Sequence, residues 1–275
     1  MAFNMNATWS KATSLVGANF SLLAVVAGVF LFLPAVVIYL AVPDMAAFMD
    51  PTADPEKMAA MMEGMMGKIF GWSALAMIFQ FVGYLAMVAL MGKARPTVGE
   101  ALAQGAKSLP TMIGTLILFM IAYAILALVI AVPLALLGTL IGPLGAVLTM
   151  IGVLFVALFL MTRFCVVMPV VMLEDTLNPI TAMKRSWQIT HPSQWSILGF
   201  WALLIVAYFV IAMLVFGVMS LMGAMAATST GSLLVMGIVN GIVGGLVAML
   251  VSGIVVAMHQ QLAGDNPANL SETFE

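Results

Sequence analysis

The sequence predicts an all-α fold, a polytopic transmembrane helical bundle with about six spans. Of its 275 residues, 64% are hydrophobic and only 7% are charged, whereas ordinary soluble domains carry about 25% charged residues. Apolar runs with almost no charge recur along the chain, and crossing hydrocarbon takes about 20 residues of helix. No polar stretch between Phe20 and His259 is long enough for a soluble domain, so we predict a single membrane domain over residues 1–275.

The first predicted span covers residues 20–42 and contains no charge. It is too long, and its flanks are too weakly basic, for a cleaved signal peptide, so we expect it to remain as a transmembrane helix.

Residues 43–68 are predicted as an acidic, Met-rich extracytoplasmic loop. It places methionines at helical spacing, at Met58, Met61, Met62, Met65 and Met66. Thioethers suit Cu(I), but the same spacing is typical of an amphipathic helix that begins at Asp54 and Pro55. With 26 methionines in the chain, packing is the favoured interpretation; copper remains the alternative.

The other predicted spans cover residues 69–91, 110–137, 143–163, 194–222 and 232–259. The boundary between the third and the fourth rests on glycine and proline, which favour a tight turn at Gly138, Gly142, Pro143 and Gly145.

The basic residues predict how the helices are oriented. Seven of the nine fall on one side of the predicted membrane, at Lys11, Lys93, Arg95, Lys107, Arg163, Lys184 and Arg185. Short loops rich in Lys and Arg stay in the cytoplasm. We therefore predict a multi-pass protein of the cell inner (plasma) membrane with both termini cytoplasmic.

Two stretches share a layout in which a short amphipathic helix, here called an elbow, precedes a long hydrophobic one. They read RPTVGEALAQGAKSLP and NPITAMKRSWQITHP, and Pro96 and Pro110 of the first correspond to Pro179 and Pro192 of the second. The N-terminal stretch NATWSKATSLVGA leads into the first span in a comparable way. This repetition predicts three tandem helical hairpins, each preceded by an elbow.

The third elbow, residues 178–190, has the clearest signals. Asn178 suits an N-cap and Pro179 the first helical position. Ile180, Met183 and Trp187 share one face, and the opposite face is polar, with Thr181, Lys184, Arg185 and Gln188. Such a helix is expected to lie in the membrane interface with Trp187 at headgroup depth. It serves either as a structural anchor or as a lipid or partner contact, for which the candidates are Arg163, Glu174, Lys184, Arg185 and Trp187.

The run PVVMLE from Pro169 to Glu174, followed by NPITAMKRSWQIT, resembles a six-helix bacterial inner-membrane family. That family includes YciC-type proteins and the membrane domain attached to some glycerophosphodiester phosphodiesterases. The resemblance implies a polytopic membrane protein that is not an enzyme and that acts in envelope homeostasis or transport. It carries over the motif positions Pro169, Glu174, Arg185, Ser186 and Trp187. Because the chain stops soon after His259, no phosphodiesterase catalytic domain is expected.

Candidate chemistry in the sequence is sparse. The two histidines, His191 and His259, and the single Cys165 form no metal-ligand cluster. His191 has Ser186 and Ser193 nearby but sits at a helix boundary, which disfavours a serine hydrolase. A net charge of −2 argues against nucleic acid as a partner. We predict no catalytic residues, no metal and no cofactor.

The last span carries a stripe of small residues with one polar member, at Gly237, Asn240, Gly241, Gly244 and Gly245. Such residues let helix backbones approach closely, so we predict packing, either within the chain or in a homo-oligomer. A conduction path lined by Asn240 and Gln80 is the alternative.

No predicted span has an ionisable residue in its middle, which disfavours ion-coupled transport. The leading hypothesis is a non-enzymatic membrane protein of envelope or lipid homeostasis that organises or moves lipid, with membrane lipids as its partners. The alternative is a membrane component of an export or immunity system for a small peptide or solute.

Overall fold

A computed structural model describes residues 3–41, 55–225 and 230–264, which are almost entirely helical, and no strand occurs among them. Six of the helices in these ranges are long and apolar enough to cross a membrane. The predicted fold class is therefore confirmed. Its reason is that hydrocarbon offers backbone amides no partners, so the backbone must satisfy itself within helices.

The chain divides into two compact units. Unit 1 comprises Met1–Ala12, Lys107–Leu204 and Ile254–Glu275, and unit 2 comprises Thr13–Ala106 and Ile205–Gly253. Four helices contribute residues to both units: α1 (Met5–Ala18), α5 (Val98–Ile141), α9 (Gln194–Met225) and α10 (Thr230–Leu262). The single membrane domain stays a prediction.

Unit 2 is built on α4 (Pro55–Leu90), against which three successive segments pack. They are α2 (Phe20–Ala27), a π-helical stretch (Gly28–Phe32) and α3 (Leu33–Ala41). Pro34 has no N–H to continue the α-helical ladder, and the turn before it widens, with Leu33 N–H donating to Gly28 O.

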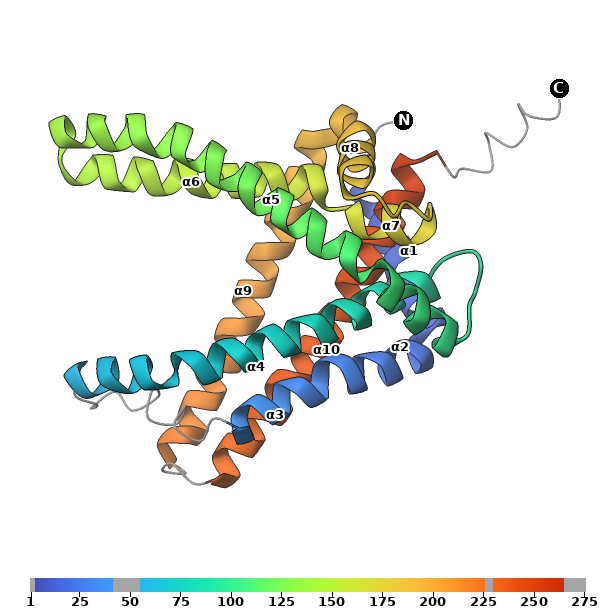
Figure 1. Ribbon diagram of the computed structural model, residues 1–275, viewed down its shortest axis with the longest axis horizontal. Helices are drawn as coiled ribbons and strands as arrows, with labels where there is room; N and C mark the ends of the chain where they lie inside the picture. Colours follow the sequence, from blue (N-terminus) through green and yellow to red (C-terminus); the bar gives the residue numbers. More distant parts are fainter. Residues whose placement is uncertain (1–2, 42–54, 226–229, 265–275) are drawn as a thin grey trace. The chain divides into compact units, whose positions relative to one another are not determined.

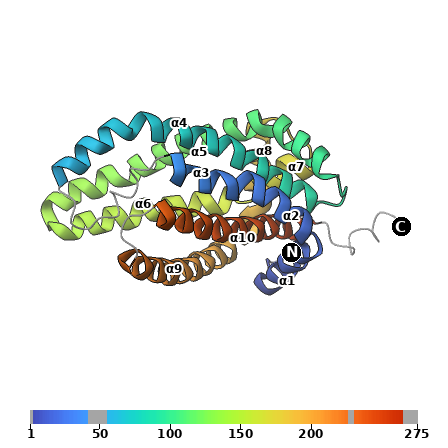
Figure 2. The same cartoon turned by 90° about the horizontal axis from the view of Figure 1, so that it is seen from below.

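Phe30 and Phe32, both in the widened turn, contact different helices. Phe30 stacks at 5.8 Å on Phe79 of α4. Phe32 meets the N-terminal part of α10, which runs beside α2 and α3 in Figure 2.

The segment predicted as a Met-rich loop is helical from Pro55 onward, and it continues without interruption into the predicted second span as α4. Residues 42–54 and the methionine side chains lie outside the described residues. The Cu(I) alternative therefore remains a prediction.

The second elbow differs from the prediction of a separate short helix. Residues from Val98 to Ile141 form one continuous helix with Pro110 and Pro133 inside it. Its start is a capping box, because Thr97 N donates to Glu100 Oε2 at 2.8 Å and Glu100 N donates to Thr97 Oγ1 at 3.3 Å.

Unit 1 contains the antiparallel hairpin of α5 and α6 (Pro143–Phe164), drawn in green in Figure 1. The predicted turn lies between them. Gly142 has φ of 64°, a left-handed conformation that glycine adopts without a steric penalty. Gly138 and Gly145 lie so close that a Cβ on Gly138 would come within 3.2 Å of Gly145 Cα.

Within unit 1, α8 (Pro179–Thr190) contacts both α6 and α7 (Val167–Leu173). Pro192 does interrupt the helix here, since His191–Ser193 forms a short 3-10 turn before α9. The chain's start is fastened to the same unit: Phe3 N donates to Ser193 Oγ at 3.3 Å, and Thr8 Oγ1 donates to Gln261 Oε1 at 2.9 Å.

Candidate functional site

The five residues predicted for lipid or partner contact all belong to unit 1. Arg163 is in the last turn of α6, Glu174 directly follows α7, and Lys184, Arg185 and Trp187 are on α8. The structure brings them into two adjoining clusters, one around Glu174 and one around Arg163.

Local sequence signals start α8 as predicted. The Asn178 side chain accepts hydrogen bonds from Ile180 N at 2.9 Å and Thr181 N at 3.2 Å, and Pro179 occupies the first helical position. An Asn cap satisfies N–H groups that the helix itself leaves unpaired. The preceding residue, Leu177, is fixed by its carbonyl, which accepts from Thr111 Oγ1 of α5 at 2.7 Å.

The side of α8 that packs on the protein consists of small or polar residues and one isoleucine. Ala182, Ser186, Ile189 and Thr190 are buried. The Ser186 hydroxyl donates to the Arg163 carbonyl at 2.8 Å. Thr190 Oγ1 makes its shortest hydrogen bond within α8, to Ser186 O at 2.8 Å, and lies 3.3 Å from the Arg163 carbonyl oxygen. The bond from Ser186 satisfies a carbonyl at the C-terminal end of α6 and holds α8 against it.

The first cluster joins α8 to α10 through one carboxylate. Arg185 Nε donates to Glu174 Oε2 at 3.0 Å and to Oε1 at 3.3 Å. His259 Nε2 lies 2.8 Å from Glu174 Oε1. Burial by itself raises the pKa of Glu174, but the hydrogen bonds from His259 and Arg185 outweigh it and lower that pKa below its ordinary value.

His259 is the site residue that sequence reasoning missed. Its side chain is only 5% exposed, and its Nδ1 is buried without a hydrogen-bond partner among the described residues. The available signal was a lone ionisable residue near the end of a long apolar helix. Nothing local in the sequence pairs it with Glu174, which is 85 positions away.

The second cluster surrounds the Arg163 side chain with aromatic rings. The guanidinium carbon lies 4.5 Å from the Trp187 ring centroid and 5.4 Å from that of Phe159. Trp187 also packs at 5.7 Å on Phe164. The structure therefore places Trp187 in an aromatic cluster within the protein, a contact that the sequence analysis did not anticipate.

The outward part of α8 exposes an apolar residue, a basic residue and two uncharged polar residues, namely Ile180, Lys184, Thr181 and Gln188. Ile180 is 65% exposed, Leu177 and Trp195 are exposed too, and so is the Lys184 side chain. Lys184 makes no ion pair with any residue that the structure describes. Exposed apolar side chains beside a cation are typical of a helix in a membrane interface.

The small residues predicted for helix packing lie on α10 in unit 2. Gly237, Gly241 and Gly245 are buried, whereas Asn240 and Gly244 are exposed. A Cβ on Gly241 would approach Phe32 Cδ2 to 2.6 Å, and one on Gly245 would lie 3.8 Å from Ala27 Cβ. A Cβ on Gly244 would meet open space.

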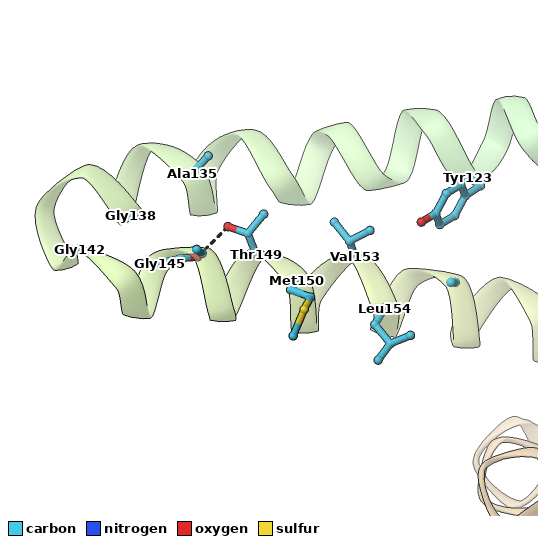
Figure 3. Close-up of a pocket in the computed structure, with 11 residues that line it drawn as sticks. Tyr123, Ala135, Gly138, Gly142, Gly145, Thr149, Met150, Val153 and Leu154 are labelled. Carbon is cyan, nitrogen blue, oxygen red and sulfur yellow. Dashed lines mark hydrogen bonds between the residues drawn. The ribbon is translucent and has the colours of Figure 1, made fainter. Parts of the chain in front are cut away.

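A groove of about 800 Å³ lies between α5 and α6 (Figure 3). Its lining is apolar apart from Tyr123 and Thr149, and the Thr149 hydroxyl is bonded to Gly145 O at 2.8 Å. No ionisable group that could act as an acid or base at neutral pH lines it. Among the described residues, no group of three or more His, Cys, Asp or Glu could hold a metal ion.

Residues 135–265, slightly less than half of the chain, match the family model described as the membrane domain of glycerophosphoryl diester phosphodiesterase. This match confirms the predicted resemblance to that membrane domain, and it covers α6 to α10. The likeness to YciC-type proteins stays a prediction. No curated protein and no solved structure matches the chain.

Proposed function

We propose that this integral membrane protein is not an enzyme and that it organises or moves membrane lipids through the interfacial elbow helix α8. The family match concerns a membrane domain and not a catalytic one, which is compatible with this role. The observation that carries the proposal is the division of α8 into two sides. The side packed on the protein buries Ala182, Ser186, Ile189 and Thr190, and the outward side exposes Ile180 and Lys184 together with the polar Thr181 and Gln188.

The charges on α8 suit anionic headgroups. Lys184 is exposed, and Arg185 shares only its Nε with Glu174 while its side chain remains 41% exposed. Each cation close to an anionic surface contributes about 1 kcal/mol of attraction. A helix with outward apolar residues and two adjacent cations would bind such a surface through both terms.

The proposed location is the inner membrane, with both termini and α8 on the cytoplasmic side. It rests on the seven basic residues on that side. A cysteine placed at the exposed Thr181, with Cys165 replaced by Ser, should resist an impermeant thiol reagent in intact cells. Labelling there would contradict this orientation.

The test compares two charge-matched variants. Lys184→Gln with Arg185→Gln removes two cations from α8, and Lys11→Gln with Lys107→Gln removes two exposed cations elsewhere. Native mass spectrometry from mixed micelles of phosphatidylglycerol and phosphatidylcholine counts the lipids that each protein retains.

We expect the α8 variant to lose its preference for the anionic lipid by about thirtyfold, as the loss of about 2 kcal/mol implies. The control variant should keep that preference. Equal lipid ratios for wild type and both variants would contradict a lipid role for α8.

A further inference from the structure

The guanidinium group of Arg163 is buried, but two of its nitrogens have no hydrogen-bond acceptor among the described residues. The residue is 5% exposed, and both Nε and Nη1 are buried with no hydrogen-bond partner among the described residues. The third guanidinium nitrogen, Nη2, is not one of the fully buried atoms without a partner. The side chain is held by two rings, those of Trp187 and Phe159.

The rings account for the position of the guanidinium but not for its N–H groups. A ring attracts a cation to its face, whereas the N–H groups of a guanidinium lie in its own plane and need acceptor atoms along its edge. A buried charged donor without an acceptor is strongly unfavourable. The N–H groups of Arg163 therefore need an oxygen acceptor that the described residues do not provide.

The neighbouring protein groups are already engaged. Glu174, the nearest acidic residue along the chain, is bound by Arg185 and His259. The Ser186 hydroxyl donates to the Arg163 carbonyl and so holds the backbone at this point. No group that the structure describes accepts a hydrogen bond from Arg163 Nε or Nη1.

The depth of Arg163 fits an acceptor from a headgroup. Helix α6 has 22 residues and is about 33 Å long at about 1.5 Å per residue, while the hydrocarbon core is about 30 Å thick. Arg163 lies in the last turn of α6. When α6 spans the bilayer, this turn reaches the interface in which phosphates lie.

We infer that Arg163, held against the rings of Trp187 and Phe159, binds the oxygens of a phosphate group that enters from the Nη2 side. A planar guanidinium can bind two phosphate oxygens at once, which an ammonium group cannot do in the same way. The inference rests on the proposed lipid role and extends it. The cations of α8 distinguish lipids by their net charge, and Arg163 distinguishes lipids by the presence of a phosphate group. The phosphate comes from a phospholipid or from solution.

The experiment measures how far each of four additions raises the thermal stability of the full chain in detergent. They are phosphatidylglycerol, phosphatidylcholine, glucosyl diacylglycerol, which has no phosphate, and inorganic phosphate. The variants are Arg163→Gln, Arg163→Lys and the double change Lys184→Gln with Arg185→Gln. Arg163→Lys keeps a cation beside the rings but loses the planar donor edge, and it carries the test if Arg163→Gln does not fold.

We expect both phospholipids to stabilise the wild type, including the zwitterionic one, and glucosyl diacylglycerol to have little effect. The Arg163 variants should need about tenfold more phosphatidylcholine for the same stabilisation. The double variant should lose only its preference for phosphatidylglycerol. Stabilisation by inorganic phosphate alone, if Arg163 is required for it, would identify a soluble phosphate as the source.

The inference is overturned if the Arg163 variants respond to phosphatidylcholine as the wild type does, or if the wild type responds equally to the lipid without phosphate. If the inference is overturned in either way but the double variant still loses its preference for phosphatidylglycerol, the proposed lipid role of α8 is unaffected. If no lipid acts on any of the proteins, both proposals fail.

Discussion

Helices are joined in two contrasting ways in the two units. In unit 2, the Gly241 backbone of α10 faces the Phe32 ring with no room for a side chain between them. In unit 1, α6 and α8 are joined by the hydrogen bond from the Ser186 hydroxyl to the Arg163 carbonyl and by the packing of the Arg163 guanidinium on the Trp187 ring. One contact depends on size and the other on hydrogen bonding and charge.

This difference indicates that the contact in unit 2 serves stability, whereas the contact in unit 1 is suited to binding. Close packing of small residues suffices to associate helices in lipid, so the contact in unit 2 needs no further role. Buried charges are costly in such a setting. The buried charge at Arg163 therefore distinguishes the contact between α6 and α8 from the contact in unit 2.

The largest expected effect comes from filling the contact in unit 2. Gly241→Leu adds a side chain whose first carbon already overlaps Phe32, and overpacking of this kind costs about 1–3 kcal/mol. Gly244→Leu is the matched control, because its Cβ meets open space. Melting curves in detergent should show a clear loss for the first variant alone.

The same pair bears on the predicted homo-oligomer. Since Gly241 is occupied by a contact within the chain, a seam between copies would have to use the exposed side that includes Gly244. If Gly244→Leu changes the mass of the oligomer but not the melting temperature, the interface between copies includes Gly244. Equal destabilisation of both variants would contradict the distinction between the two sides of α10.

A smaller effect is expected from Glu174→Gln, which keeps the shape of the side chain but removes the charge facing Arg185 and His259. A loss of about 1–2 kcal/mol at neutral pH follows from weakening charged hydrogen bonds. Folding lowers the pKa of Glu174 from 4.5. Its stabilisation is therefore present above about pH 4.5 and is lost as the pH falls through the lower, folded-state pKa.

Melting of wild type and Glu174→Gln across this acidic range checks that sign. The difference in melting temperature between them should decrease as the pH falls. The difference between wild type and Gly241→Leu should stay constant, because a steric clash does not involve a titrating group. A gap for Glu174→Gln that does not change with pH would show that its charge is not what stabilises the cluster.

The smallest effect is expected at the start of α8. Asn178→Ala removes the acceptor for Ile180 N and Thr181 N, and loss of such a cap costs about 1 kcal/mol. Asn178→Ser keeps an acceptor and should restore most of the stability. If the Ser variant melts like the Ala variant, the cap does not hold this elbow in place.

Features encoded within a few residues were predictable from the sequence. The cap at Asn178 and the turn at Gly142 and Pro143 each depend on neighbouring residues, and both are present. The count of helices followed in the same way from long apolar runs.

The features that escaped prediction depend on distant residues or on how a proline is accommodated. His259 meets Glu174 across 85 positions, and Trp187 covers Arg163 only because α8 folds back on α6. Two prolines in matching places of the repeat behave differently: Pro110 lies within α5, but a 3-10 turn forms at Pro192. Motif spacing alone does not distinguish these two outcomes.

The widened turn at Gly28–Phe32 limits how the first span can change in evolution. A π turn closes over one residue more than an α turn, so deletion of one residue within it would give a regular helix in which Leu33 to Ala41 keep their faces relative to α2. A deletion in the regular helix on either side would instead rotate all that follows by about 100°. Phe30 and Phe32 face different helices, and a rotation between α2 and the residues after it would break contacts on at least one of these helices. Single-residue deletions in the first span should therefore be better tolerated within the π turn than on either side of it.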